Sequence, residues 1–103
     1  MRSRGDGPPR DPRVRPTKFP LGGIYMTPGI SESVGNTELL RALRRHADGD
    51  WGNLDADDRQ ANERAVTEGG RILSAYESER GVEFWIITEA DRSATTALLP
   101  SEY

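Results

Sequence analysis

The sequence contains no cysteine and only one histidine, His46. Disulfide bonds, thiol nucleophiles and zinc sites built on cysteine are therefore excluded, and so is a metal site built on several histidines. A chain without disulfides suits a reducing compartment, so we expect a cytoplasmic location. No cofactor is expected either, because the pairs Gly22-Gly23 and Gly69-Gly70 lack the flanking residues of a phosphate-binding loop.

Long hydrophobic runs are also missing. Apolar residues make up 34% of the 103 residues, and no stretch approaches the ~20 apolar residues that a membrane-spanning helix needs. Arginine, proline and glycine follow the first residues, where a signal peptide would have its apolar core. We therefore expect a small soluble protein that has no membrane partner.

Charge is distributed unevenly along the chain. Residues 1–18 contain six basic and two acidic residues, a net charge of +4, whereas residues 19–103 contain 8 basic and 15 acidic residues, a net charge of −7. Four of the seven prolines lie in the first 17 residues, which cannot bury enough apolar surface to offset the entropy lost on ordering. We predict a disordered basic tail over residues 1–17 and one compact domain over residues 18–103. The tail either solubilises the protein or contacts nucleic acid through Arg10, Arg13, Arg15 and Lys18.

Hydrophobic periodicity predicts two helices in the middle of the chain. The first begins after Thr37, its predicted N-cap, and ends at Asp48-Gly49. Its buried face is predicted to hold residues spaced at the 3.6-residue period: Leu39, Leu40, Leu43, His46 and Ala47. The second helix is predicted over residues 56–68, with Asp55 as its N-cap and Gly69-Gly70 after its last residue.

Strands are predicted on both sides of this helical region. A short strand over residues 22–27 has the proline and glycine neighbours of a sheet edge. Residues 71–77 and 82–88 are predicted to form a β-hairpin, and residues 93–99 a further strand. The segment 82–88 is apolar on both faces, which is typical of a central strand. The element order β-α-α-β-β-β predicts an α+β fold with two helices packed on a small antiparallel sheet.

The loop after the first helix holds candidates for chemistry and for contact. His46, Asp48 and Asp50 form an acid–base pattern in which a carboxylate would orient the imidazole; the alternative is a half-buried histidine favoured by the helix dipole. Five carboxylates lie between residues 48 and 58, but the glycine and glutamate of a calcium-binding EF-hand loop are missing there, so we expect no metal site. Trp51 either projects as an anchor for a partner or folds back as a lid over the core.

A second group of polar side chains follows the predicted central strand. One interpretation is a patch that binds a ligand or a partner, beside the hydroxyls of Ser74 and Tyr76. The alternative is hydroxyl pairing across strands next to a salt-bridged turn. The group consists of Thr88, Glu89, Asp91, Arg92 and Thr96.

Several stretches of residues 19–103 are similar to stretches of one family: Leu21–Gly29, Arg45-His46, Gly49–Gly52, Asp58, Asn62, Leu73–Tyr76, Trp85–Ser93, Thr95-Thr96, Leu98–Pro100 and Glu102-Tyr103. In these stretches the chain resembles the short plasmid-related proteins of bacteria and their mobile elements. Some members carry a label as the modification subunit of type I restriction endonucleases. This chain holds neither the glycine-rich loop nor the Asn/Asp-Pro-Pro-aromatic motif of an adenine methyltransferase, so we expect no DNA methylation by it. The resemblance covers residues 19–103 and leaves out the basic tail.

No set of catalytic residues is visible in the sequence. We therefore expect a non-enzymatic accessory protein of a mobile element, which contacts a protein partner through the Trp51 loop or through residues 88–96. The alternative is a nucleic-acid-directed protein. The order β-α-α-β-β-β is similar to that of RelE/ParE-type ribonuclease toxins, and the basic tail would suit a DNA-contacting accessory factor. The acidic balance of residues 19–103 disfavours the toxin.

Overall fold

A computed structural model describes residues 16–103. The predicted basic tail, with Arg10, Arg13 and Arg15, thus lies outside the described residues apart from Pro16 and Thr17, which are exposed. Within the described residues no helix is long and apolar enough to cross a membrane. The elements are β1 (Gly23–Met26), α1 (Pro28–Ser33), α2 (Asn36–Ala47), α3 (Ala56–Glu68), β2 (Ile72–Glu77), β3 (Glu83–Thr88), β4 (Ala94–Leu98) and the 3-10 helix η1 (Pro100–Glu102).

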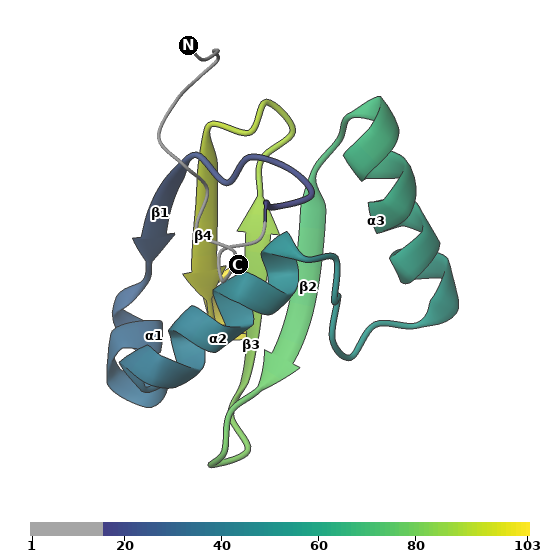
Figure 1. The fold of residues 1–103 in the computed structure, drawn as a ribbon. Helices are drawn as coiled ribbons and strands as arrows, with labels where there is room; N and C mark the ends of the chain where they lie inside the picture. The colour runs from purple at the N-terminus through teal and green to yellow at the C-terminus, as the bar shows by residue number, and fades with distance from the viewer. Residues whose placement is uncertain (1–15) are drawn as a thin grey trace, which may run out of the picture.

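The four strands form one sheet in the order β1-β4-β3-β2 (Figure 1). The predicted α+β class is confirmed, and β1 and β3 take the predicted edge and interior positions. The pairs β2–β3 and β3–β4 are antiparallel, but β1 pairs parallel with β4. The sheet is therefore mixed, and the prediction of an antiparallel sheet is wrong. The pattern of a four-residue edge strand does not encode its direction. Here the direction allows α1 to follow β1 and to place Ile30 in the core with Ala97 of β4.

The first half of the chain contains one helix more than predicted. Thr27 is the N-cap of α1, since its hydroxyl accepts a hydrogen bond from the Ile30 N–H at 3.3 Å, and Pro28 occupies the first turn. The N-cap of α2 is Gly35, so the assignment of Thr37 as the cap is wrong by two residues. Leu40 was predicted to be buried but is 66% exposed, because α2 turns a narrower stripe toward the sheet.

The bounds of α3 are those that the sequence predicted. The Asp55 carboxylate accepts the Asp58 N–H at 2.8 Å, and Gly69 ends the helix at a φ of 97°. The helix lies beside the outer edge of β2 (Figure 1). There the Asn62 amide pairs with the Leu73 backbone, donating to the carbonyl at 2.7 Å and accepting the N–H at 3.2 Å.

The loop that leads to α3 closes the same edge one step further along β2. Asn53 donates its N–H to the Ala75 carbonyl at 2.8 Å, and Ala75 donates to the Trp51 carbonyl at 3.1 Å. The Asn62 amide and the loop thus occupy backbone hydrogen-bonding groups of β2 that a fifth strand would otherwise pair with. This arrangement protects β2 against pairing with another chain.

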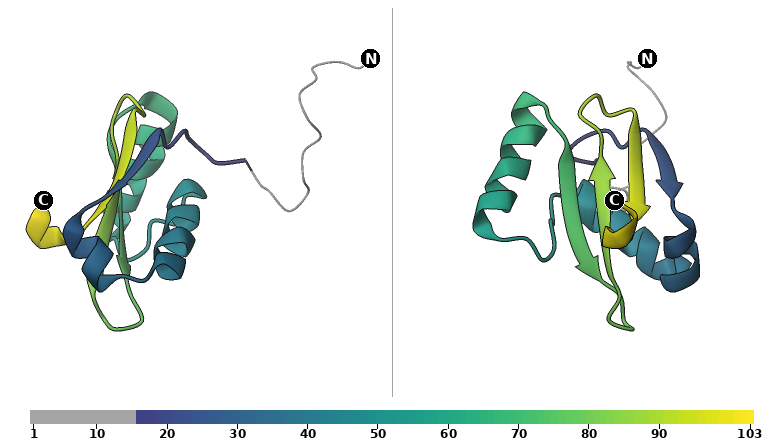
Figure 2. Two further views of the ribbon diagram at one scale, coloured as in Figure 1. Left: turned by 90° about the vertical axis from the view of Figure 1, so that its left-hand side faces the viewer. Right: turned by 180° about the vertical axis from the view of Figure 1, so that it is seen from behind.

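The two faces of the sheet are covered unequally. Figure 2 shows α2 on one face and only η1, with the C-terminus, on the other. Under α2 lies the larger apolar cluster, and a smaller cluster joins α3, the N-terminal segment and the start of β2. The larger cluster contains Ile30, Val34, Leu39, Ala42, Tyr76, Phe84, Ile86 and Ala97; the smaller contains Phe19, Trp51, Ala65 and Ile72.

Candidate functional site

His46 is fully buried between α2 and the sheet. Its Nδ1 lies 2.6 Å from the Ser74 Oγ and its Nε2 lies 2.9 Å from the Thr88 Oγ1. Thr88 contacts Thr95 at 2.7 Å, and the Thr95 hydroxyl donates to the Leu21 carbonyl at 2.7 Å. A chain of polar groups therefore joins β2, α2, β3 and β4 to the segment that precedes β1.

The hydrogen bond from Thr95 to Leu21 fixes the direction of the other hydrogen bonds in this network. The Thr95 hydroxyl donates its hydrogen bond to the Leu21 carbonyl, so its oxygen accepts a hydrogen bond from the Thr88 hydroxyl. The Thr88 oxygen in turn accepts a hydrogen bond from the Nε2–H of His46. The Nδ1 of His46 then accepts from Ser74. His46 is thus neutral and protonated on Nε2, and burial lowers its pKa to about 4. Both ring nitrogens are occupied and out of reach of solvent, so this histidine cannot act on a substrate.

The carboxylates that would orient His46 in an acid–base set have other partners. Asp48 pairs with Arg44 at 3.0 Å, and Asp50 accepts two hydrogen bonds from the Arg45 guanidinium at 2.8 and 3.2 Å. Those hydrogen bonds hold the pKa of Asp50 below its usual range. Of the two interpretations of His46, the structure therefore favours the structural one: the imidazole points into the sheet, and Asp48 and Asp50 pair with arginines instead of orienting it.

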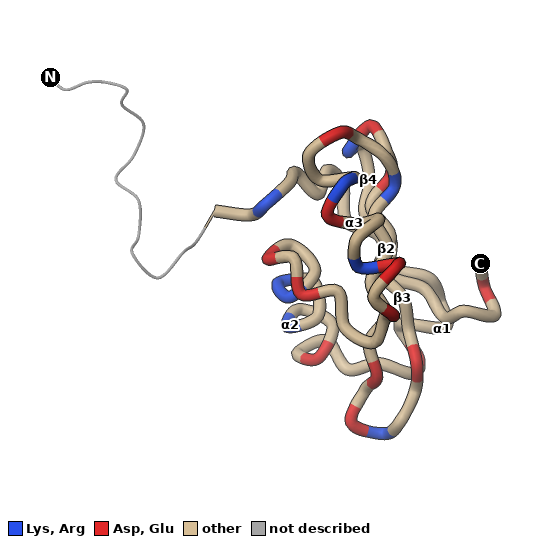
Figure 3. The backbone as a smooth tube through the Cα atoms, turned by 90° about the vertical axis from the view of Figure 1, so that its right-hand side faces the viewer, with Lys and Arg blue, Asp and Glu red and all other residues tan. Residues whose placement is uncertain are grey.

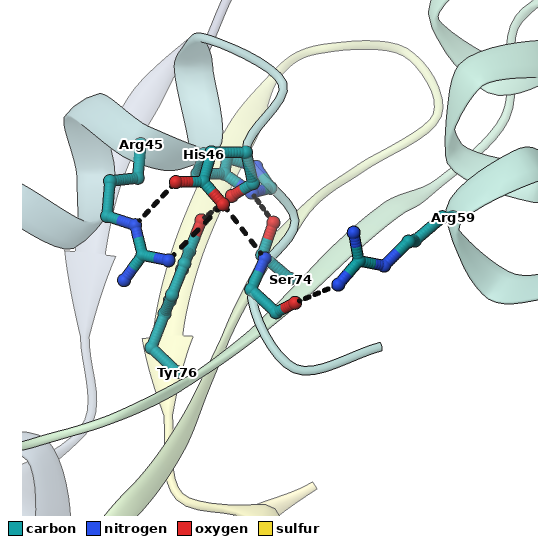
Figure 4. A network of polar contacts seen from close by, with 7 residues as sticks. Arg45, His46, Arg59, Ser74 and Tyr76 are labelled. Atoms are coloured by element: carbon teal, nitrogen blue, oxygen red, sulfur yellow. Dashed lines mark hydrogen bonds and ion pairs between the residues drawn. The ribbon is translucent and has the colours of Figure 1, made fainter. Parts of the chain in front are cut away.

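Arginines and a tyrosine fasten the loop of residues 50–54 to the domain (Figure 4). The Tyr76 hydroxyl donates to the Asp50 carbonyl at 2.6 Å, and Arg45 stacks on the Tyr76 ring at 4.7 Å. From α3, Arg59 donates to the carbonyls of Gly52 and Leu54 at 3.0 and 2.9 Å. Burial raises the pKa of the Tyr76 phenol, which stays protonated and keeps its role as a donor.

Trp51 takes the second of its two predicted positions. It is 4% exposed, lies against Phe19 at a ring distance of 6.1 Å, and donates its indole N–H to Glu63 at 2.9 Å. Its neighbour Gly52 has a φ of 75° and runs so close to β2 that a Cβ would stand 2.0 Å from the Ala75 carbonyl oxygen. The tryptophan is a lid over the smaller apolar cluster and offers no surface to a partner.

The predicted patch around residues 88–96 is divided by the sheet. Thr88 is buried under α2 in the histidine network, whereas Thr96 points to the opposite face and is half-buried. In the turn between them, Glu89 pairs with Arg71 at 3.3 Å, and the Asp91 carboxylate accepts the Ser93 N–H at 3.0 Å. These residues do not converge on one surface.

Arg92 holds this turn against the end of α3. Its guanidinium donates to the carbonyls of Ala65, Gly70 and Glu89 at 2.8, 2.6 and 3.1 Å, and lies 5.7 Å from the Phe19 ring. A cation at a helix C-terminus offsets the helix dipole. The contacts also compensate for the left-handed backbone of Arg92, whose φ is 63°.

The face of the sheet that turns away from α2 is covered only in part, by η1 and the C-terminus (Figure 2). Alternation and strand register place Trp85, Thr96 and Tyr25 on this face, since their neighbours Phe84, Ile86 and Ala97 lie in the core under α2. Tyr103, which follows η1, meets Trp85 edge-on at a ring distance of 5.7 Å, and its hydroxyl accepts a hydrogen bond from Arg71 at 2.6 Å. We call this surface the outer patch, made of Tyr25, Arg71, Trp85, Thr96 and Tyr103.

The side chains of the outer patch are of the kinds that protein interfaces use. Tyr25 and Tyr103 are 59% and 68% exposed. Tryptophan, tyrosine and arginine are enriched among the residues that dominate binding energy. At the end near the hairpin turn, Glu77 and Glu83 stand directly opposite each other on neighbouring strands. Like charges at such a pair repel, and a basic side chain from a partner would relieve that repulsion.

Comparisons of this chain with protein-family models, with curated proteins and with solved structures found no match. The resemblance to plasmid-related proteins therefore stays a prediction. Among the described residues no group of three or more histidine, aspartate or glutamate side chains is arranged to hold a metal ion. The candidate site thus rests on the outer patch and not on a reactive centre.

Sequence reasoning did not single out Trp85, Tyr25 or Tyr103. The alternation along residues 82–88 does place Trp85 opposite Phe84, but both faces of that strand were interpreted as buried. Because β3 is only partly covered on the outer side, Trp85 is half-buried. Its packing against Tyr103 joins positions 18 residues apart, so no local pattern could have revealed it.

Proposed function

We propose that this protein is a non-enzymatic accessory factor that binds a protein partner through the outer patch. The observation that carries the proposal is the outer patch, where Tyr25, Arg71, Trp85 and Tyr103 lie on a sheet face that, of the described helices, only the short η1 covers in part. The resemblance to plasmid-related proteins supports a bacterial mobile element as its setting. The reducing compartment expected from the absence of cysteine makes the cytoplasm the place where the partner would be met.

Charge favours a basic segment on the partner. The domain has a net charge of −7 over residues 19–103, and Figure 3 shows acidic residues spread over it with few basic ones between them. Glu77 and Glu83 lie on the outer face with the patch. A partner that combines apolar side chains with lysine or arginine would match both features.

The proposal is tested with a long charged side chain at the centre of the outer patch. We expect Thr96→Arg to weaken partner binding at least tenfold, about 1.4 kcal/mol. Leu40→Arg is the control, since Leu40 is 66% exposed on α2, which covers the other face. Both tagged variants and the wild type are incubated with nuclease-treated lysate of the native host. Retained proteins are identified by mass spectrometry, and binding of each purified candidate is then titrated.

A protein that binds the wild type and Leu40→Arg but not Thr96→Arg would support the proposal. Equal binding to all three would contradict it, because the outer patch would then lie outside the interface. Partners that the wild type captures from untreated lysate but not from nuclease-treated lysate would favour the nucleic-acid alternative. In that case, removal of residues 1–17 should abolish a binding that weakens steeply between about 50 and 200 mM salt.

A further inference from the structure

The two edge strands of the sheet, β2 and β1, differ in whether their outer edges are covered. The outer edge of β2 is closed by Asn62 and by the loop of residues 51–53. No such cover lies on β1 among the described residues, and the three residues Ile24, Tyr25 and Met26 are 47%, 59% and 47% exposed. Natural edge strands usually avoid pairing by carrying a charge, a proline or a bulge. β1, with the sequence Gly-Ile-Tyr-Met, carries none of them.

Backbone geometry identifies the groups that this edge presents. The N–H groups of Gly23 and Thr27 point toward β4, where they donate to the carbonyls of Ser93 and Ala97 at 3.0 and 3.1 Å. Because alternate residues of a strand face opposite neighbours, Tyr25 also pairs toward β4. The N–H and C=O groups of Ile24 and Met26 therefore face away from the sheet, toward the open edge.

We propose that β1 pairs antiparallel with β1 of a second copy of this chain. About a two-fold axis beside Tyr25, Ile24 of one copy lies opposite Met26 of the other, and each Tyr25 lies opposite its equivalent. Ile24 and Met26 then form hydrogen-bonded pairs, which use all four outward groups of each copy, while the two tyrosines form the non-hydrogen-bonded pair between them. A two-fold axis placed beside any other residue of β1 would leave some of the outward N–H and C=O groups of Ile24 and Met26 without a partner in β1 of the second copy.

The side chains fit a second copy as well as the backbone does. Every pair in this register is apolar or aromatic, and such cross-strand pairs each stabilise by roughly 0.2–1 kcal/mol. β1 carries no charge, so the acidic domains do not meet like charge at the contact itself. The first 15 residues of the chain are a poor alternative occupant, because Pro8, Pro9 and Pro12 lack the N–H groups that pairing needs. The paired copies would join their outer faces into one continuous surface.

The absence of cysteine permits a direct test with a single introduced thiol. In the proposed dimer the two Tyr25 Cα atoms are about 4.5 Å apart, as in any non-hydrogen-bonded antiparallel pair, which lies within the range that a disulfide spans. Purified full-length Tyr25→Cys should therefore form disulfide-linked dimer on mild oxidation far faster than Leu40→Cys, a control at another exposed position. Equal rates for the two variants would overturn the proposal.

A second pair of variants tests the register. The chain with Ile24→Lys and Met26→Lys places like charges opposite each other at both hydrogen-bonded pairs and should be a monomer of 11.4 kDa. The chain with Ile24→Lys and Met26→Glu changes the same positions but places opposite charges together, and should keep the doubled mass of the wild type in light scattering.

A wild type that stays monomeric as its concentration is raised would overturn the proposal. So would a Lys/Lys variant that dimerises as well as the Lys/Glu variant does, because pairing would then use another surface. Both measurements need only the purified chain. Their failure would leave the binding of a different protein through the outer patch unaffected.

Discussion

At the scale of single residues, the histidine that looked most like a catalytic group is a structural one. His46 donates one hydrogen bond, to Thr88 at 2.9 Å, and accepts another, from Ser74 at 2.6 Å. Buried polar groups are costly only when they lack hydrogen-bond partners, and in this network the hydroxyls of Ser74, Thr88 and Thr95 all have one. The network specifies how α2 sits on the sheet, because only one orientation of the helix aligns both ring nitrogens with hydroxyls.

Replacement of His46 should therefore reduce stability. His46→Ala removes two hydrogen bonds, leaves Ser74 and Thr88 with unsatisfied groups at fully buried positions, and creates a cavity. We expect a loss of about 3 kcal/mol in the free energy of unfolding. The loss is measured by urea denaturation followed by circular dichroism. Leu40→Ala on the exposed side of the same helix should change stability by less than about 0.5 kcal/mol. A loss of that small size for His46→Ala would show that the network does not stabilise the fold.

At the scale of elements, the two edges of the sheet differ in how the described chain covers them. α3 stacks few large apolar residues against the domain, and its buried positions are Asn62 and Ala65. Its contribution lies in placing the Asn62 amide where a neighbouring strand would otherwise pair. The helix thus acts as a cover for β2, while β1 at the opposite edge is left without one in the described chain.

Loss of the Asn62 amide should open the edge of β2. Asn62→Ala leaves the N–H and C=O of Leu73 without protein partners at a site that is only partly accessible to water, which should cost about 1–3 kcal/mol. Hydrogen exchange at the Leu73 amide should become faster in the same variant. Gln60→Ala, at an exposed position of α3, is the matched control and should leave both quantities unchanged. Unchanged exchange at Leu73 in Asn62→Ala would argue that water or a neighbouring side chain replaces the amide.

At the scale of the whole molecule, stability should depend on pH through the buried histidine. The ordinary pKa of 6.5 applies in the unfolded chain, and burial lowers the pKa to about 4 in the folded one. Between these values the unfolded chain binds a proton that the folded chain does not, so acid favours unfolding. The contribution of His46 is complete above pH 6.5 and is lost as pH falls toward 4.

The expected loss over this pH range is about 3 kcal/mol, from 1.36 kcal/mol for each unit of pKa difference. It is measured as the free energy of unfolding in urea at a series of pH values. His46→Gln, which keeps a polar side chain but does not titrate, should give a flatter profile between pH 6.5 and 5, above the range in which most carboxyl groups titrate. Profiles of equal slope for the two proteins would contradict a neutral, buried His46.

For the molecule as a whole, local sequence patterns predicted some structural features, and long-range packing determined the others. Composition, capping residues and periodicity predicted the α+β class, the exact bounds of α3 from Asp55 and Gly69, the hairpin, and the edge and interior positions of β1 and β3. These features depend on interactions within a few residues, which a local pattern records. The sequence alone also excluded disulfides and thiol chemistry, because no cysteine is present.

Only the tertiary structure decided which side chains meet. The partners of His46 lie 28 and 42 residues away, Trp51 is buried by Phe19 and by Glu63 of α3, and β1 runs parallel to a strand some 70 residues later. No local rule links such positions, since their approach depends on how all the elements pack at once. Packing also left the outer patch and the edge of β1 exposed, which is why the surfaces proposed for function became visible only in the folded molecule.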